Sequence, residues 1–248
     1  MRLPPFQPDW ALFLDVDGTL LDIAERPDQV DTHEVDCALV EGLERAAGGA
    51  LALISGRSLA QLDAMFAPLR LAAAGQHGYE RRDAQGQRHR HRFPVETLAP
   101  AKDELRAFAS RHPGLVLEDK GASVALHYRL APQLEQAAFD AMRRASAALG
   151  SLVHTQAGKM VWELKPAGAD KGMAIDEFMR EPPFAARTPV FLGDDVTDEH
   201  GFRLVNRLGG HSIKVGAGDT EARWRLPDPA AARAWLREWL NSAGAEGR

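Results

Sequence analysis

Two short apolar runs in distant parts of the chain each lead into a pair of aspartates. The run 11–16 leads into the sequence DVDGT, and the run 189–192 leads into GDD. Continuous apolar runs of this length are typical of strands that are buried on both faces of a parallel sheet. The carboxyl ends of parallel strands line the ligand crevice of a doubly wound sheet. We therefore expect four carboxylates to lie together at that edge: Asp15, Asp17, Asp194 and Asp195.

Further strands and helices alternate on either side of these motifs. Apolar runs and hydrophobic residues at three- and four-residue steps predict strands at 50–54, 71–74 and 211–215, and helices at 35–46, 59–66, 170–179, 197–208 and 228–240. This alternation predicts an α/β fold, a doubly wound parallel sheet with right-handed crossovers and helices on both faces. We expect it in a discontinuous domain of residues 1–96 and 166–248.

Residues 97–165 have a different order of elements, which predicts an inserted second domain. The order αββαββ is typical of an α+β domain with an antiparallel sheet and helices on one side. Alternation in the strands 123–129 and 159–165 makes one sheet face apolar. The other face carries Glu118, Lys120, His127, Arg129, Lys159 and Glu163. This polar face is either simply solvated, as is common in antiparallel sheets, or a surface that binds a ligand.

The segment 80–92 differs in composition from the predicted regions on either side of it. It contains seven arginines and histidines among Gln, Asp and Gly. Charged runs usually face solvent, and we expect a solvated hairpin here.

Composition excludes several classes of protein. The chain has 248 residues, of which 45% are hydrophobic and 26% charged, with a net charge of −5. It therefore lacks a global positive field that would attract nucleic acid. A single cysteine, Cys37, cannot form an internal disulfide, and no apolar run approaches the roughly 20 residues of a membrane span. We expect a cytoplasmic monomer that binds neither nucleic acid nor a membrane and acts on a small molecule.

The expected cluster of carboxylates predicts a metal ion. Several carboxylates in one crevice repel each other, which raises their pKa values or destabilises the fold. A hard divalent cation relieves this repulsion, and a site with only oxygen ligands favours Mg²⁺. The two aspartate motifs contain no His or Cys, so zinc is disfavoured.

Groups that bind phosphate are expected at the same edge of the sheet. Ser55 and Gly56 follow the second predicted strand, and Lys171 opens the helix after the inserted domain. A hydroxyl, backbone N–H groups and a lysine at strand ends make a cradle for phosphate. Together with an aspartate and Mg²⁺, these residues predict phosphoryl transfer through an aspartyl-phosphate.

These motifs resemble those of a known family. The segments 15–19 (DVDGT), 54–57 (ISGR) and 193–199 (GDDVTDE), together with Lys171, are similar to the four motifs of haloacid-dehalogenase-type phosphatases. Within that superfamily, GQHGYE, LEDKGASVALHYR and GKMVWELKP resemble segments of the trehalose-6-phosphate phosphatases. The resemblance covers nearly the full chain. It implies a Rossmann-like core with an αββαββ cap inserted between the second and third motifs.

The resemblance also implies roles for the core residues. Asp15 would be the nucleophile and a metal ligand, and Asp17 the general acid and base that also contacts the metal through its backbone carbonyl. Asp194 would be a metal ligand through its side chain, and Asp195 would hold metal-bound water or orient its neighbours, as would Asp198. The phosphate would be bound by Ser55, Lys171, Thr19 and Gly56.

In the cap, the resemblance implies that Lys159 and Glu163 bind glucose hydroxyls, with Glu118, Lys120, His127 and Arg129 as further candidates. The implied activity is Mg²⁺-dependent hydrolysis of trehalose 6-phosphate to trehalose and phosphate, the last step of trehalose biosynthesis. Three alternatives stay open: another sugar phosphatase that acts on sucrose phosphate or a hexose phosphate, a non-catalytic phosphosugar sensor, and a phosphomutase.

Overall fold

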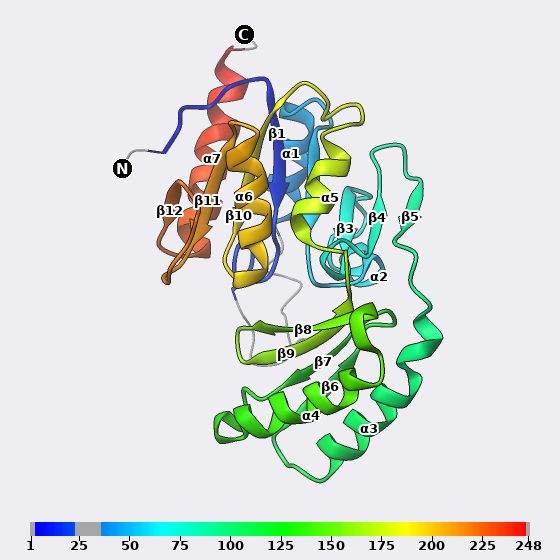
Figure 1. Ribbon diagram of the computed structural model, residues 1–248. Helices are drawn as coiled ribbons and strands as arrows, with labels where there is room; N and C mark the ends of the chain where they lie inside the picture. Colours follow the sequence, from blue (N-terminus) through cyan, green and yellow to red (C-terminus); the bar gives the residue numbers. More distant parts are fainter. Residues whose placement is uncertain (1–2, 23–35, 247–248) are drawn as a thin grey trace. The chain divides into compact units, whose positions relative to one another are not determined.

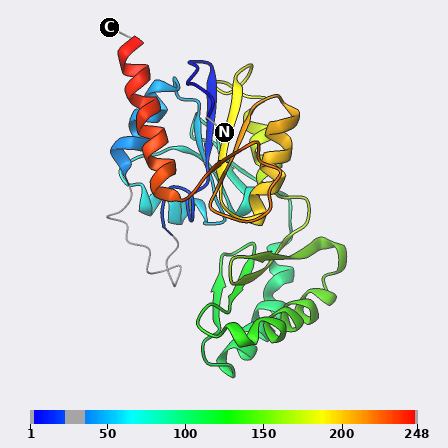
Figure 2. The same cartoon turned by 90° about the vertical axis from the view of Figure 1, so that its left-hand side faces the viewer.

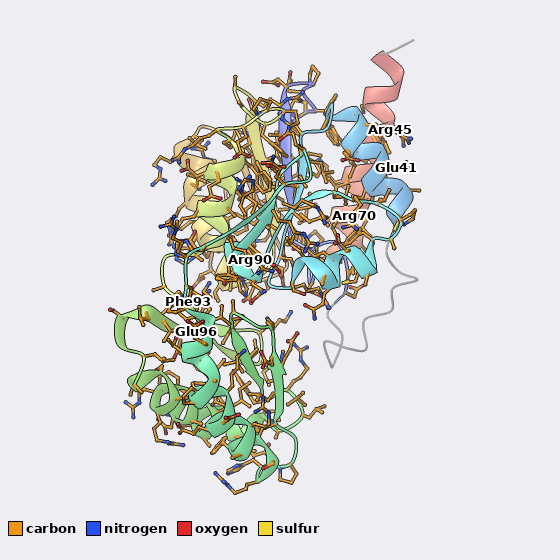
Figure 3. All side chains as sticks on the ribbon, turned by 90° about the vertical axis from the view of Figure 1, so that its right-hand side faces the viewer. Glu41, Arg45, Arg70, Arg90, Phe93 and Glu96 are labelled. Carbon is orange, nitrogen blue, oxygen red and sulfur yellow. The ribbon has the colours of Figure 1, made fainter. Side chains whose placement is uncertain are left out.

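The computed structural model describes residues 3–22 and 36–246, and the chain divides into two compact units. The core unit consists of Met1–Arg90 and Asp170–Arg248, and the inserted unit is His91–Ala169. Both boundaries lie a few residues outside the expected range 97–165. Figure 3 labels Arg90 at the end of the core unit's segment, and Phe93 and Glu96 at the start of the inserted one.

The core unit is built on one eight-stranded sheet with the order β12-β11-β10-β1-β2-β3-β4-β5 (Figure 1). The neighbours from β12 to β3 pair in parallel, whereas β3–β4 and β4–β5 are antiparallel. The strands are β1 (Trp10–Leu14), β2 (Leu51–Ile54), β3 (Ala72–Gly75), β4 (Glu80–Arg82), β5 (Arg88–Arg90), β10 (Thr188–Gly193), β11 (His211–Val215) and β12 (Trp224–Leu226). The expected α/β fold with a large parallel sheet is therefore confirmed. The short strand β12 was not expected.

Helices cover both faces of this sheet. The helix α1 (Cys37–Ala46) packs with α7 (Pro229–Glu246) on one face, and α5 (Lys171–Phe178) packs with α6 (Glu199–Arg207) on the other (Figure 2). The short helix α2 (Leu59–Met65) follows β2. β1 is buried along its whole length, as expected for a strand between two helical layers.

Side-chain caps fix where the helices of the core unit begin. The carboxylate of Asp170 accepts a hydrogen bond from the backbone N–H of Met173 at 2.8 Å, so that α5 starts at Lys171. Ser58 and Gln61 form a capping box at the start of α2. Such caps satisfy backbone N–H groups that lack partners inside the helix.

The inserted unit has a four-stranded antiparallel sheet with the order β6-β7-β9-β8. Both of its helices lie on one face of the sheet (Figure 2). Its elements are α3 (Ala99–Ser110), β6 (Val116–Asp119), β7 (Val124–His127), α4 (Glu135–Ala147), β8 (Val153–Gly158) and β9 (Val161–Pro166). Leu126 and Leu164 on the apolar sheet face form a buried core with Met142 of α4, as the alternation predicts.

The expectation of a solvated hairpin at 80–92 is wrong for its first strand. β5 is largely exposed, but Glu80, Arg81 and Arg82 of β4 are buried. Their charges are paired: Arg82 donates to Asp63 at 2.7 Å, and Arg81 contacts Glu177 and Glu181. The run is therefore an ion-paired strand that ties the edge of the sheet to the segment that contains α5.

The strand expected at 159–165 also differs at its start. β9 begins at Val161, and Met160 has a left-handed backbone conformation with φ of 63°. Lys159 therefore lies in the turn between β8 and β9, and its predicted place on the same strand face as Glu163 is wrong. None of the helices within residues 3–22 and 36–246 is long and apolar enough to cross a bilayer.

Replacing Glu181 by Gln tests the ion pair between Arg81 and Glu181. Arg81 donates to both carboxylate oxygens of Glu181, at 2.7 and 2.9 Å, and lowers the pKa of Glu181. We expect Glu181→Gln to lower the free energy of unfolding by about 1 kcal/mol at pH 7, since the Arg81 side chain is buried but that of Glu181 is 35% exposed. A lowered folded-state pKa contributes stability above the unfolded value of about 4.3. The difference from wild type should therefore disappear as the pH falls through the folded pKa.

Denaturant titrations at pH 7 and at acidic pH measure this difference. Glu41→Gln is the control, because Glu41 and Arg45 form an exposed pair at 3.7 Å on α1 (Figure 3). We expect that substitution to change stability by less than about 0.5 kcal/mol. Equal effects of the two substitutions would contradict the role given to Arg81.

Candidate active site

The buried carboxylate of Asp15 lies directly after β1 and is held by two other side chains. The ammonium of Lys171, the first residue of α5, donates to Oδ1 of Asp15 at 2.8 Å. The hydroxyl of Thr19 donates to Oδ2 at 3.2 Å. Both oxygens of Asp15 thus have a fixed direction, as a carboxylate nucleophile requires.

The same lysine also holds the loop after β10. Lys171 donates to Oδ1 of Asp198 at 2.7 Å. Oδ2 of Asp198 accepts hydrogen bonds from the backbone N–H groups of Asp194 and Asp195, at 3.0 and 2.9 Å. Asp198, which is fully buried, therefore shapes the loop that carries Asp194. The ammonium of Lys214 on β11 donates to the backbone carbonyl of Asp194 and supports the same loop.

The two aspartate loops approach each other closely at Gly18. Gly18 has φ of 83°, and a Cβ atom at this position would lie 2.1 Å from Oδ2 of Asp194. Only glycine fits this backbone conformation and this distance. The loop after β1 and the loop after β10 are therefore in direct contact, as the order of parallel strands requires.

Ligand atoms of Asp15, Asp194 and Asp198 lie within 4.8 Å of one another. Burial raises the pKa of the Asp15 carboxyl well above its usual range, and Asp198 and Asp194 add to this effect while Lys171 opposes it. Although burial also opposes the charge on Lys171, Asp15 and Asp198 raise the pKa of its ammonium, which stays protonated. A further positive charge beside Asp15 would lower this pKa and favour the ionised carboxylate. The chemistry of these oxygen donors fits a divalent cation.

A tight turn after β2 carries Ser55 and Gly56, which the sequence predicts to bind phosphate. The hydroxyl of Ser55 accepts a hydrogen bond from the backbone N–H of Arg57 at 3.1 Å, and the N–H of His77 donates to the carbonyl of Ser55 at 3.0 Å. A Cβ atom on Gly56 would lie 2.8 Å from the ring of His77, so a larger residue at position 56 would require that ring to shift. His77 itself is buried and has φ of 55°. Backbone strain of this kind is concentrated at functional sites.

The carboxylate of Asp17 is paired with Arg57. Nε of Arg57 donates to Oδ2 of Asp17 at 2.7 Å, and Nη2 donates to Oδ1 at 2.6 Å. Among the residues of the described ranges, Asp17 is not part of the side-chain cluster around Asp15. Its expected metal contact, through the backbone carbonyl, stays a prediction.

The inserted unit has a separate polar cluster centred on Glu163. Ser123 donates to Oε1 of Glu163 at 2.7 Å, and Lys120 contacts Oε2 at 3.4 Å. In the strand register Glu118, Ala125 and Glu163 stand side by side on neighbouring strands. Ala125, which is buried, separates the two carboxylates. These residues therefore form one polar sheet face with fixed donors and acceptors.

The other expected sugar-binding residues lie around this cluster. His127 contacts Glu118 at 3.0 Å. Nη2 of Arg129 donates to the backbone carbonyl of Lys159 at 3.0 Å, so these two residues lie together beside the β8–β9 turn. Lys159 itself is exposed.

Comparison with known proteins identifies the family. Residues 13–230 match the family described as trehalose-phosphatase. The trehalose-6-phosphate phosphatase of Escherichia coli (strain K12) is 46% identical over 233 residues, which cover 94% of this chain and 87% of that protein. The chain belongs to the trehalose-phosphatase family. The family assignment rests on these sequence matches, which include both aspartate motifs.

Solved structures agree with the fold of a trehalose-phosphatase. The C-terminal domain of a trehalose-6-phosphate phosphatase from Candida albicans matches with a TM-score of 0.84 at 22% identity, covering 94% of this chain and 92% of that one. A haloacid dehalogenase-like hydrolase from Bacteroides thetaiotaomicron matches with a TM-score of 0.64 at 13% identity, covering 94% and 99%. At these identities the likeness concerns the fold alone.

The structure brings Asp15 and Asp194 together as expected, but other contacts of the candidate site differ from the expected ones. The expected ligand set included Asp195, whereas the structure groups Asp198 with Asp15 and Asp194. The Asp195 carboxylate accepts from the backbone N–H of Val196 at 2.7 Å and caps the short turn there; its metal role stays a prediction. Lys214 was missed because it is a lone lysine in an apolar strand, and nothing in the sequence marks its partner.

Replacing Gly18 by Ala tests the contact between the two loops. The added methyl group would collide with the Asp194 carboxylate, and we expect the affinity for Mg²⁺ to fall about 10–100-fold, as for other residues that orient metal ligands. Titration calorimetry with Mg²⁺ measures this. Gly86→Ala is the matched control, since Gly86 has φ of 85° but nothing within 4 Å of the added Cβ. Equal losses in both variants would show that backbone strain, not the collision, is responsible.

Proposed function

We propose that this protein hydrolyses trehalose 6-phosphate to trehalose and inorganic phosphate. Membership of the trehalose-phosphatase family and the name of the 46% identical E. coli protein support this substrate. The observation that carries the reaction type is the buried Asp15 carboxylate, held by Lys171 beside two further carboxylates. A buried, oriented carboxylate next to a fixed cation is suited to nucleophilic attack on a phosphoryl group.

In the proposed mechanism Asp15 is the nucleophile. One of its carboxylate oxygens attacks phosphorus, the bond between phosphorus and the sugar oxygen breaks, and Asp17 donates a proton to the leaving sugar oxygen. Asp17 then removes a proton from a water molecule, which attacks phosphorus and releases phosphate and free Asp15. The Lys171 ammonium offsets the negative charge of the transition state, and Ser55 with Gly56 and Thr19 binds the phosphate oxygens.

We further propose that the cation is Mg²⁺. The side chains of Asp15 and Asp194 and the backbone carbonyl of Asp17 would hold it, with Asp195 and Asp198 orienting the loop or water around it. When bound, the ion offsets the combined negative charge of the carboxylates and the phosphate. A cytoplasmic location and a monomeric state stay predictions from the sequence.

The sugar would be recognised by the polar sheet face of the inserted unit. Sugar hydroxyls require fixed donors and acceptors. The side chains of Glu163, Ser123 and Lys120 are such groups, because their mutual hydrogen bonds hold them in place. Glu118, His127, Arg129 and Lys159 extend this surface. The expected sugar-binding role of each of these residues is part of the proposal.

A panel of phosphosugars tests the proposed function. We expect the purified protein with Mg²⁺ to prefer trehalose 6-phosphate over sucrose 6-phosphate, glucose 6-phosphate and mannose 6-phosphate when phosphate release is measured. Asp15→Asn should abolish turnover, because it removes the nucleophile. A preference for a monosaccharide phosphate would overturn the substrate, and equal slow release by wild type and Asp15→Asn would overturn the enzymatic role. Conversion of one sugar phosphate to its isomer would instead indicate a phosphomutase.

Replacing Glu163 by Gln tests the sugar-binding face. Loss of one charged hydrogen-bond acceptor should raise the KM for trehalose 6-phosphate about 10–100-fold, since such bonds contribute about 1.5–3 kcal/mol. The rate with p-nitrophenyl phosphate, which has no sugar, should stay within about two-fold of wild type on the same reasoning. Glu104→Gln on α3 is the control, because Glu104 is exposed and 3.9 Å from Arg144. A parallel loss on both substrates would contradict a role in sugar recognition.

A further inference from the structure

We propose that Arg57 is a positioning residue that holds the general acid–base carboxyl of Asp17 beside the phosphate-binding turn. The motif ISGR places Arg57 next to Ser55 and Gly56, and phosphate binding accounts for those two residues but not for the arginine. This inference rests on the proposed function, in which Asp17 transfers the proton. It assigns to Arg57 an effect on the reaction that acts only through Asp17.

The contact between Arg57 and Asp17 has the geometry of a fork. Nε and Nη2 of Arg57 donate to different oxygens of the same carboxylate, at 2.7 and 2.6 Å. Paired bonds of this type fix both the position and the plane of a carboxylate, which a lysine cannot do. The arginine side chain is 12% exposed, whereas that of Asp17 is 34% exposed. A largely buried guanidinium therefore holds a carboxylate that remains open to a reacting group.

The backbone of Arg57 is itself fixed by the neighbouring strand ends. Its carbonyl accepts from the N–H of Gln76 at 2.9 Å, and the carbonyl of Ser55 accepts from the N–H of His77 at 3.0 Å. The carboxylate of Glu80 accepts from the N–H of Leu59 at 2.8 Å and secures the chain just after the turn. The turn is thus tied to β3 and β4, and the guanidinium extends from a rigid base toward the loop after β1.

At least one of the two contacts of Arg57 is compatible with each role of Asp17. As a base, the carboxylate can accept both hydrogen bonds. As an acid, one oxygen carries the proton toward the leaving sugar oxygen while the other keeps its bond to the guanidinium. Arg57 can therefore keep the carboxyl in place through both halves of the reaction. Without Arg57 the side chain of Asp17 would rotate freely, and proton transfer would lose its alignment.

Substrates whose leaving groups differ in basicity distinguish the positioning of Asp17 by Arg57 from a role of Arg57 in phosphate binding. A sugar alkoxide needs a proton as it leaves, whereas 2,4-dinitrophenolate leaves without one. General acid catalysis contributes about 10²–10⁴-fold when it operates. We expect Arg57→Gln to lower kcat/KM for the sugar phosphate about 10–100-fold, a part of that contribution. With 2,4-dinitrophenyl phosphate, kcat/KM should change by less than about three-fold. The reason is that kcat/KM depends only on the steps up to formation of the aspartyl-phosphate, and this leaving group needs no proton in those steps.

The experiment measures kcat/KM with both substrates for wild type, Arg57→Gln, Arg57→Lys, Asp17→Asn and the double variant Asp17→Asn/Arg57→Gln. The lysine variant should give an intermediate loss, and it keeps the test informative if Arg57→Gln does not fold. In the Asp17→Asn background, Arg57→Gln should cause no further loss. Arg82→Gln is the control for a buried ion-paired arginine away from the site, and any loss there should be equal for both substrates.

The outcomes separate this inference from the proposed function. Equal losses on both substrates with Arg57→Gln, or a further loss in the Asp17→Asn background, would overturn the positioning role and leave Asp17 as the acid. A loss with Asp17→Asn that does not depend on the leaving group would overturn the role of Asp17 itself, and the positioning role with it.

Discussion

The ammonium of Lys171 connects the two loops that carry the buried aspartates of the candidate site. It bonds to Asp15 after β1 and to Asp198 after β10, and it is itself fixed at the first turn of α5. Because burial strongly disfavours isolated charges, neither carboxylate could lie at this depth without a cation. The lysine therefore brings together three chain segments that are distant in sequence, and it sets the position of Asp15, the proposed nucleophile.

The fold supplies this arrangement through parallel strands. β1 and β10 are neighbours in register, so their carboxyl ends lie side by side and both aspartate loops emerge at one edge. β2 pairs with the other side of β1 and delivers the turn with Ser55, Gly56 and Arg57. The segment between these motifs forms a unit with its own sheet and apolar core. One sheet therefore holds the groups proposed to react, and a separate sheet carries the polar face proposed to bind the sugar.

Individual residues show how far the sequence predicted this structure. The α/β fold, most strands and the position of Asp15, Asp194 and Lys171 at strand or helix ends followed from hydrophobic patterns and motif spacing. The burial of Arg81 and Arg82 did not, because a run of arginines has the same appearance whether it is solvated or paired with Asp63, Glu177 and Glu181. The place of Lys159 was mistaken because one residue with positive φ, Met160, ends the strand period.

The sequence by itself determined the fold class, because the hydrophobic periods of strands and helices are local, and it placed the aspartates proposed to carry the reaction at the ends of strands. Only the tertiary structure decided which partner each side chain takes. It directs Asp198 to Lys171 and Asp17 to Arg57. The physical reason is that a side chain after a strand end turns toward whichever distant segment can satisfy its charge, and the neighbouring segments are set by the packed sheet rather than by adjacent residues.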